Sequence, residues 1–192
     1  MNVVLATTNT HKADEMRPLL QEYGIGVVNR PAGLADVDET ADTLEGNALL
    51  KARAVSDAIG EVALADDTGL FVDALDGRPG VVSARYAGLG ATAEENVEKL
   101  LAELVDVDAR DARFRTVVAV SFPDGRSWWV DGVLEGDILR APRGDDGFGY
   151  DAVFAPRVLG GRSLGEVTIS EKAAMSHRTI ALRAIVATLA NK

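Results

Sequence analysis

The chain has 192 residues, of which 47% are hydrophobic and 26% are charged, and its formal net charge is −10. This composition is that of an ordinary globular protein, which excludes a disordered chain, and no apolar stretch is long enough to cross a bilayer. The acidity disfavours a nucleic-acid polymer as partner, and the absence of cysteine excludes disulfides, thiol nucleophiles and thiolate metal sites.

The chain shows no internal boundary. Residues 1–192 contain no linker rich in Pro, Gly or Ser and no internal repeat, so we expect one domain with one sizeable core. Met1-Asn2-Val3 lacks the basic region of a signal peptide, which predicts a cytoplasmic protein.

The first predicted strand, Val3–Ala6, runs directly into Thr7-Thr8-Asn9-Thr10-His11-Lys12. Small hydroxyl and amide residues that open a helix beside a lysine can hold an anion against free backbone N–H groups. We interpret this turn as a phosphate cradle. The alternative is an ordinary strand-to-helix turn, because the glycines of the Walker and dinucleotide-binding loops are missing.

Helical periodicity begins at once and continues to a stop at Gly24. Pro18 lies inside this segment and predicts a kink or an early break, because proline removes one backbone hydrogen bond. Residues 27–28 are typical of a short strand, and residues 31–41 of an acidic loop.

A second helix is predicted over residues 44–59, with Gly60 closing it. Its apolar residues share one face, while Asn47 and Lys51 lie four residues apart on another face. These two polar side chains are therefore expected to point in the same direction.

A short buried strand, Val62–Ala65, leads into Asp66-Asp67-Thr68-Gly69, and extended sequence resumes at Leu70. Consecutive strand residues point to opposite faces, so only one of Asp66 and Asp67 is expected to work in a given crevice. Open α/β sheets bind ligands at the carboxyl ends of strands, where a carboxylate can hold Mg²⁺ or deprotonate an attacking water. The alternative is a pair of turn or helix-cap aspartates.

The second half of the chain predicts a third helix over residues 93–104 and then a hairpin. Residues 113–122 and 127–134 form its strands around Pro123-Asp124-Gly125. An antiparallel hairpin added to the earlier strand and helix alternation predicts an α/β fold with a mixed central sheet flanked by helices.

A glycine-dense loop, Gly144–Asp151, carries Phe148 and Tyr150 between glycines. Aromatic rings next to glycines can offer a face on which a planar base stacks. The alternative, equally compatible with the sequence, is a tight loop whose two aromatic rings pack into the core.

Thr168-x-x-Glu171 is a capping-box pattern that begins the C-terminal helical region. The residues of that region predicted to point inward are Ile180, Ala184, Ile185 and Leu189.

Ser176-His177-Arg178 places a titratable group beside a permanent cation, with Lys172 nearby in sequence. We expect these residues to line a polar pocket, and a buried histidine satisfied by hydrogen bonds is the alternative. His11 is expected in solvent. No nucleophile elbow is present, so water is the favoured nucleophile.

Six segments occur in order along the chain, and together they closely resemble the inosine triphosphatase family, the pyrophosphatases that remove non-canonical purine nucleoside triphosphates. The segments are Thr7–Lys12, Asn47–Arg53, Ala65–Leu70, Pro79–Tyr86, Phe148–Asp151 and Ser176–Arg178.

For the phosphate end of the substrate, the resemblance implies that Asn9, Lys12 and Lys51 hold the triphosphate. It also implies that Asp67 is the general base and a Mg²⁺ ligand, and that Thr68 contacts the nucleotide. The whole turn is included among the implied substrate contacts: Thr7, Thr8, Asn9, Thr10, His11 and Lys12.

For the base, the resemblance implies that Phe148 stacks on the purine, with Gly149, Tyr150 and Asp151 completing the wall. Three further residues, Lys172, His177 and Arg178, would contact the base near its 6-oxo group. Donors that meet an oxygen there lose their partner when a 6-amino group replaces it, which favours hypoxanthine and xanthine over adenine.

The chain departs from the family at one position. The family often carries two adjacent acids before the Asn-Ala of the second helix, and the second acid is associated with metal binding. Here the pair is Glu45-Gly46. Either Glu45 or Asp66 is therefore expected to complete the metal site with Asp67.

The resemblance implies a homodimeric enzyme that uses Mg²⁺ to hydrolyse ITP, dITP and XTP to the monophosphate and pyrophosphate. One alternative is a pyrophosphatase of the Maf type, which acts on modified pyrimidine triphosphates. Another is a nucleotide sensor that binds without catalysis, although two acids beside bound phosphates argue against a sensor that lacks a metal.

Overall fold

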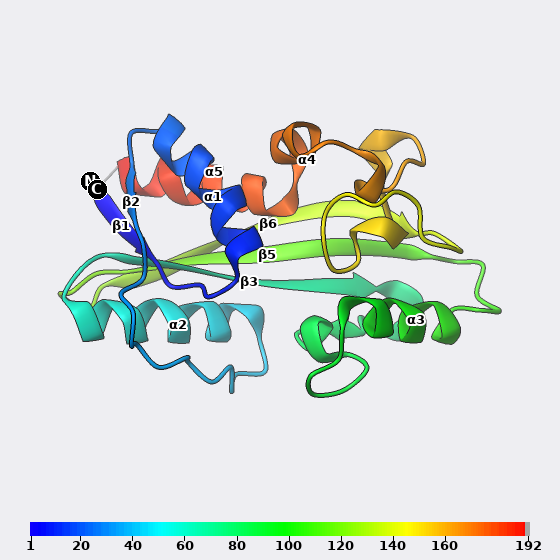
Figure 1. Cartoon of the computed structure of the whole chain (residues 1–192), viewed down its shortest axis with the longest axis horizontal. Coiled ribbons are helices and arrows are strands. Elements are labelled where there is room, and N and C mark those ends of the chain that lie inside the picture. Colours follow the sequence, from blue (N-terminus) through cyan, green and yellow to red (C-terminus); the bar gives the residue numbers. More distant parts are fainter. Residues whose placement is uncertain (191–192) are drawn as a thin grey trace. The chain divides into compact units, whose positions relative to one another are not determined.

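A computed structural model describes residues 1–190, and its helices and strands lie in the order shown in Figure 1. The strands are β1 (Asn2–Leu5), β2 (Gly26–Val28), β3 (Ala63–Val72), β4 (Pro79–Gly80), β5 (Asp111–Ser121), β6 (Ser127–Ile138) and β7 (Phe154–Pro156). The α-helices are α1 (Thr10–Glu22), α2 (Leu44–Ile59), α3 (Ala93–Glu103), α4 (Ile169–Met175) and α5 (His177–Ala190). Short 3₁₀ helices cover Asp73–Leu75, Ser83–Arg85, Asp151–Val153, Arg157–Leu159 and Leu164–Glu166.

The strands form a mixed sheet, as the sequence predicted. They are hydrogen-bonded in the order β2-β1-β3-β5-β6-β7, and β4 pairs with β3. β1 runs parallel to β2 and to β3, with Leu5 opposite Leu64. β4 pairs with β3 and β7 pairs with β6 in the antiparallel sense.

The chain divides into two compact units. Unit 1 contains residues 1–67, 116–132 and 177–192, and unit 2 contains residues 68–115 and 133–176. Each unit has its own cluster of buried apolar side chains. The predicted single core is therefore wrong. β3 and β5 each supply buried residues to both clusters, whereas β6 supplies buried residues to one and only the partly buried Trp128 and Val130 to the other. One domain for residues 1–192 stays a prediction.

In unit 1, α1 and α5 lie on one face of the strands and α2 lies on the other (Figure 1). The bounds of α2 are those predicted from sequence. The Thr43 side chain caps its first turn by accepting a hydrogen bond from the Gly46 N–H at 3.0 Å. Gly60 ends the helix in the left-handed conformation, with φ of 68°, which glycine adopts without a steric penalty.

The break predicted at Pro18 does not occur, and α1 continues to Glu22. Proline at this position removes only the hydrogen bond to the carbonyl of Asp14. Because Asp14 is exposed, water can satisfy that carbonyl, and the helix tolerates the loss.

The buried stripe of α5 differs from the prediction. Ile180 is 39% exposed, and Ala184 and Leu189 are only partly buried, whereas Ile185 is buried as expected. The helix begins at His177, and its stripe starts at the buried Arg178 and repeats at helical spacing. The stripe continues through Ala181, Leu182, Ile185 and Val186.

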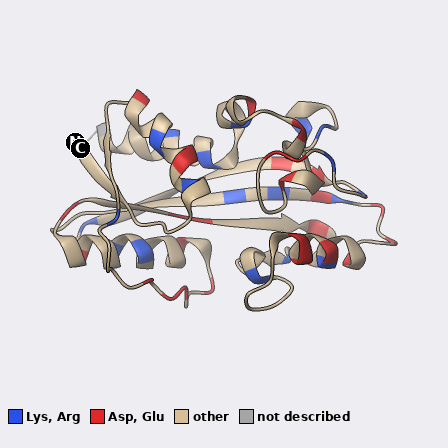
Figure 2. Cartoon of the chain, in the orientation of Figure 1, with Lys and Arg blue, Asp and Glu red and all other residues tan. Residues whose placement is uncertain are grey.

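In unit 2, α3 begins with a capping box between Thr92 and Glu95 and buries Val97 and Leu100. Acidic residues gather along this helix (Figure 2). Part of the net negative charge thus belongs to a solvated helix face, which agrees with a role in solubility.

Gly132 on β6 lets α5 approach the sheet closely. A Cβ at this position would lie 2.3 Å from the His177 carbonyl oxygen and 2.4 Å from the Ala181 nitrogen. These are backbone atoms and cannot turn aside. We expect Gly132→Ala to lower the free energy of unfolding by about 1–3 kcal/mol, with a melting temperature lower by several degrees in calorimetry.

The matched control is Asp131→Ala, because Asp131 is exposed on the neighbouring position of the same strand. We expect its melting temperature to stay close to that of the wild type. Equal melting temperatures for the Gly132→Ala variant and the wild type would contradict the close contact.

Candidate active site

Asp66 and Asp67 lie in the middle of β3 rather than at its carboxyl end. The strand continues without interruption to Val72, which corrects the prediction that the pair lies where its strand ends. A Cβ on Gly69 would meet the Gly80 carbonyl oxygen at 2.6 Å. Gly69 therefore permits the close approach of β4 and does not mark a turn.

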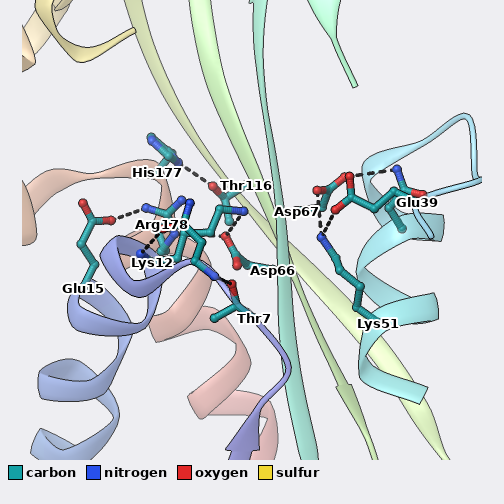
Figure 3. A network of polar contacts seen from close by, with 12 residues as sticks. Thr7, Lys12, Glu15, Glu39, Lys51, Asp66, Asp67, Thr116, His177 and Arg178 are labelled. Atoms are coloured by element: carbon teal, nitrogen blue, oxygen red, sulfur yellow. Dashed lines mark hydrogen bonds and ion pairs between the residues drawn. The ribbon is translucent and has the colours of Figure 1, made fainter. Parts of the chain in front are cut away.

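The pairing of β3 with β1 nevertheless ends just before the two aspartates. β1 ends at Leu5 opposite Leu64, and the last hydrogen bond between the two strands joins the Ala6 N–H to the Leu64 carbonyl at 2.7 Å. Asp66 and Asp67 follow directly beyond this end. Their side chains point to opposite faces of β3, as predicted from strand geometry (Figure 3).

On one face of β3, Asp67 lies among polar side chains of α2 and of the preceding loop. Lys51 donates to Asp67 Oδ1 at 3.1 Å and to Glu39 Oε1 at 2.6 Å. The amide of Asn47 donates to Asp67 Oδ2 at 3.4 Å. Asn47 and Lys51 thus point the same way along α2, as their spacing predicted. Glu39 is a contact that the sequence analysis missed.

These charges shift the ionisation of Asp67 and Lys51. Burial raises the pKa of Asp67, Lys51 opposes the rise, and the Glu39 carboxylate adds to it. For Lys51, burial favours the neutral amine, but Asp67, Asp66 and Glu39 together raise its pKa. Lys51 therefore stays protonated, and Asp67 is a stronger base than an ordinary aspartate.

On the opposite face, Asp66 is fully buried between two cations. Its Oδ2 lies 3.2 Å from the ammonium of Lys12 on α1 and 3.1 Å from Nε of Arg178 on α5. Glu15 pairs with the same guanidinium through Nη1 (Figure 3). Although burial alone would raise the pKa of Asp66, Lys12 and Arg178 hold it well below its usual value.

The two neighbouring aspartates are therefore expected to titrate in opposite directions in the metal-free protein. As the pH falls, Asp67 takes up a proton above the ordinary value of 3.8, and Asp66 stays ionised below it. Carboxyl ¹³C chemical shifts followed by NMR across the acid range measure both midpoints. Glu39→Gln removes a like charge and is expected to lower the Asp67 midpoint while leaving that of Asp66 in place. Equal midpoints for the two carboxyls would contradict this electrostatic picture.

The turn before α1 is partly occupied by its own hydrogen bonds. Asn9 caps the helix by accepting from the Lys12 N–H at 3.2 Å, and Thr7 Oγ1 accepts from the Asn9 N–H at 3.2 Å. The His11 side chain is exposed, as expected. Residues 7–10 also line a cavity of about 470 Å³ together with residues of α1 and of the loop 29–34.

His177, at the start of α5, has a specific partner. Its Nδ1 lies 2.5 Å from Thr116 Oγ1 on β5, and both residues are buried. This arrangement matches the alternative weighed in the sequence analysis, a buried histidine satisfied by hydrogen bonding.

A second polar cluster lies in unit 2 around the glycine-dense loop. The carboxylate oxygen Oδ2 of Asp151 accepts from the Phe148 N–H at 2.9 Å and from the Lys172 ammonium at 2.7 Å. The same ammonium lies 4.5 Å from the centre of the Phe148 ring, within cation–π range. Asp151 and Lys172 are buried, while Phe148 and Gly149 are partly exposed.

The two aromatic residues of this loop differ. Tyr150 packs into the core, its hydroxyl donates to the Ser83 carbonyl at 2.9 Å, and burial raises its pKa. Phe148, in contrast, is a partly exposed residue. Thr68, also in unit 2, is partly buried on β3.

The predicted metal ligands do not gather as expected. Asp66 is turned away from Asp67 and neutralised by two cations, which argues against a metal shared by the two. Within residues 1–190, no group of three or more His, Asp or Glu side chains is placed to hold a metal. Glu45 lies in the first turn of α2, about 200° of helical rotation from Asn47. The carboxylate that accompanies Asp67 at Lys51 is Glu39.

The signal for Glu39 in the sequence is weak. It lies in the acidic stretch 31–41, which has no periodic pattern that would orient one side chain. Glu15 and Thr116, the partners of Arg178 and His177, were also missed, because each lies about 60 or more residues away in sequence from the group it contacts.

Comparison with known proteins gives consistent matches over nearly the whole chain. The Ham1 family model matches residues 3–188. A curated relative from Nitratidesulfovibrio vulgaris, named dITP/XTP pyrophosphatase, is 47% identical over 96% of this chain and 93% of its own length. One from Thermoanaerobacter sp. (strain X514), with the same name, is 45% identical over 95% of this chain and 93% of its own. The solved structure of a HAM1 protein from Coxiella burnetii is 38% identical, covers both chains completely and has a TM-score of 0.90. In the described part of the chain, no helix is long and apolar enough to span a membrane.

Proposed function

The chain belongs to the Ham1 family, and from this membership and the clusters around Asp67 and Phe148 we propose that it hydrolyses dITP, ITP and XTP to the monophosphate and pyrophosphate. The family match confirms the resemblance drawn from six short segments. Relatives named dITP/XTP pyrophosphatase at 45–47% identity support the substrate class and the nucleoside triphosphate pyrophosphatase activity. The observation that carries the proposal is the buried Asp67 carboxylate, which accepts from the Lys51 ammonium at 3.1 Å beside Glu39.

In the proposed reaction, a water molecule attacks the α-phosphorus of the substrate. Asp67 takes the proton of this water, the new oxygen–phosphorus bond forms, and the bond from the α-phosphorus to the α–β bridging oxygen breaks. Pyrophosphate leaves with the bridging oxygen. Burial and Glu39 raise the pKa of Asp67, which makes the carboxylate a more effective base than an exposed aspartate.

Lys51 and Lys12 supply positive charge for the polyphosphate. Lys51 also holds the carboxylates of Asp67 and Glu39 through its ammonium, so that their orientation is set before substrate arrives. Lys12 extends from the first turn of α1 and is 17% exposed. Lysine at such a position acts as a point charge toward phosphate oxygens.

The carboxylates on the Asp67 face of β3 suit magnesium. Asp67 and Glu39 present carboxylate oxygens to one ammonium nitrogen, and Mg²⁺ in nucleotide enzymes is held by one or two carboxylates together with substrate phosphates and water. We therefore propose Asp67 and Glu39 as the residues that would hold Mg²⁺. When bound, the ion would neutralise charge on the polyphosphate.

For the base, we propose that the ring of Phe148, a partly exposed residue, stacks on the purine. Asp151 fixes this residue by accepting its N–H, and Lys172 lies against the ring. Tyr150 would contribute by anchoring the loop on Ser83 rather than by touching the base. Base contacts by Lys172, His177 and Arg178 remain proposals drawn from the family resemblance.

A substrate panel tests the proposed function. We expect pyrophosphate release from ITP, dITP and XTP with Mg²⁺, and much slower release from ATP and GTP. Efficient cleavage of modified pyrimidine triphosphates with poor cleavage of dITP would favour a pyrophosphatase of the Maf type. Binding of ITP without any product after prolonged incubation would favour a sensor.

From the family resemblance we also infer a homodimer that works in the cytoplasm. Several large apolar side chains of unit 2 are exposed and could be covered by a second copy, among them Leu89 at 93% and Ile169 at 76%. Light scattering coupled to size-exclusion chromatography measures the mass, and cell fractionation measures the location. A monomer at micromolar concentration would contradict the first of these two inferences.

A further inference from the structure

Asp66 shares a single oxygen between two cations that come from different helices. Lys12 Nζ and Arg178 Nε both lie within 3.2 Å of Asp66 Oδ2 (Figure 3). The Asp66 side chain is 0% exposed and that of Arg178 is 2% exposed, whereas Lys12 is 17% exposed. Of the three charged groups, the Lys12 ammonium is therefore the one that a ligand can reach.

The two cations differ in the number of carboxylates that neutralise them. Arg178 has a second carboxylate partner, Glu15. Among the ion pairs of residues 1–190, Asp66 is the carboxylate paired with Lys12. If Lys12 turns toward a phosphate oxygen, Arg178 therefore stays neutralised by Asp66 and Glu15. This asymmetry allows Lys12 to exchange partners without leaving an uncompensated buried charge.

We propose that Asp66 is a positioning residue whose carboxylate is an exchangeable counter-ion for Lys12. It holds the ammonium in one orientation before substrate arrives, and the polyphosphate of the substrate displaces it. The inference rests on the proposed function, since it assigns the polyphosphate to Lys12. As a positioning residue, Asp66 neither accepts a proton nor touches substrate.

The proposal predicts opposite effects on binding and on turnover. Asp66→Asn keeps the shape of the side chain and removes the competing negative charge, so a bare polyphosphate should bind Lys12 more tightly. Without the carboxylate, Lys12 also loses its orientation, and a misplaced contact lowers turnover. A residue that only maintained the fold would weaken both quantities together.

The experiment uses inorganic tripolyphosphate and isothermal titration calorimetry on the full chain, in EDTA. We expect Asp66→Asn to bind tripolyphosphate about tenfold more tightly than the wild type. In steady-state assays with ITP and Mg²⁺, the same variant should show kcat about tenfold or more lower and a KM that is unchanged or lower. Unchanged or weaker tripolyphosphate binding by the folded variant would overturn the proposal.

Two further variants complete the test. In a Lys12→Met background, Asp66→Asn should change the dissociation constant by less than about twofold, since the competing pair no longer exists. Asp66→Glu retains the charge, so it should bind tripolyphosphate within about twofold of the wild type while kcat falls. Tighter binding by the Glu variant would overturn the proposal even if Asp66→Asn does not fold.

Failure of this inference can be told apart from failure of the proposed function. Calorimetry with tripolyphosphate requires no turnover, so a chain that did not hydrolyse ITP would still report the exchange of partners at Lys12. Conversely, the wild type could hydrolyse ITP while the Asp66→Asn variant binds tripolyphosphate no more tightly than the wild type. That result would refute only the positioning role of Asp66.

Discussion

Asp67→Asn is expected to lower kcat for ITP by about 10²–10⁴-fold, the range typical of a lost general base. The amide is isosteric with the carboxylate and can still accept from Lys51, so the surroundings of β3 should remain intact. Steady-state release of pyrophosphate measures the loss. Circular dichroism and the melting temperature show whether the variant is folded.

The matched control is Asp57→Asn, which changes an exposed aspartate on α2 to the same amide. Its kcat should stay within about twofold of the wild type, as for most surface substitutions. An Asp67→Asn variant that keeps nearly full turnover would refute the role of Asp67 as base.

Lys12→Met is expected to have the second-largest effect, a fall in kcat/KM for ITP of about 10- to 100-fold. Methionine keeps the length of the side chain and loses the charge, which removes one charge-assisted contact with the polyphosphate. KM should rise, because the contact is already made in the bound ground state. Lys12→Arg should recover part of the activity by restoring the charge.

Arg126→Gln serves as the charge control for this prediction. Arg126 lies in the β5–β6 turn of the same unit, its side chain is 60% exposed, and its loss changes the net charge by the same amount. We expect kcat/KM within about twofold of the wild type, because Arg126 pairs with the exposed Asp124 and exposed charges are largely screened by salt. An equal loss of activity in both variants would mean that Lys12 acts only through the overall charge.

Features of the fold that depend on residues close together in sequence were predicted correctly. The ends of α2 follow from Thr43 and Gly60, and the Thr168 capping box begins α4 where expected. The opposite faces of Asp66 and Asp67 follow from strand geometry alone. In each case the deciding atoms lie within a few residues of one another.

The incorrect predictions concern features that depend on contacts between residues far apart in sequence. Gly69 permits the close approach of Gly80, which strand periodicity does not reveal. The sequence therefore placed the end of a strand at Asp67, where β3 in fact continues. Ile180 is exposed because the buried stripe of α5 starts at Arg178. The partners of Arg178 lie on α1 and β3, 163 and 112 residues away in sequence.

The site was predicted in part. The residue types and the order of the segments pointed to Asp67, Lys12 and Lys51, and the structure brings each of them into a charged cluster of unit 1. Glu39 was not found, because an aperiodic acidic loop gives no orientation. The environment of Asp66 could not be predicted from the sequence either. Nothing in the sequence indicates that Lys12 on α1 and Arg178 on α5 contact the same carboxylate oxygen of Asp66.

The attack of water on the α-phosphorus, with Asp67 as base, is the central step of the proposed reaction. Hydrolysis of ITP in H₂¹⁸O, followed by mass spectrometry of the products, locates the attacked atom directly. We expect one ¹⁸O atom in the inosine monophosphate and unlabelled pyrophosphate. Label in the pyrophosphate, or release of orthophosphate in its place, would contradict the proposed reaction.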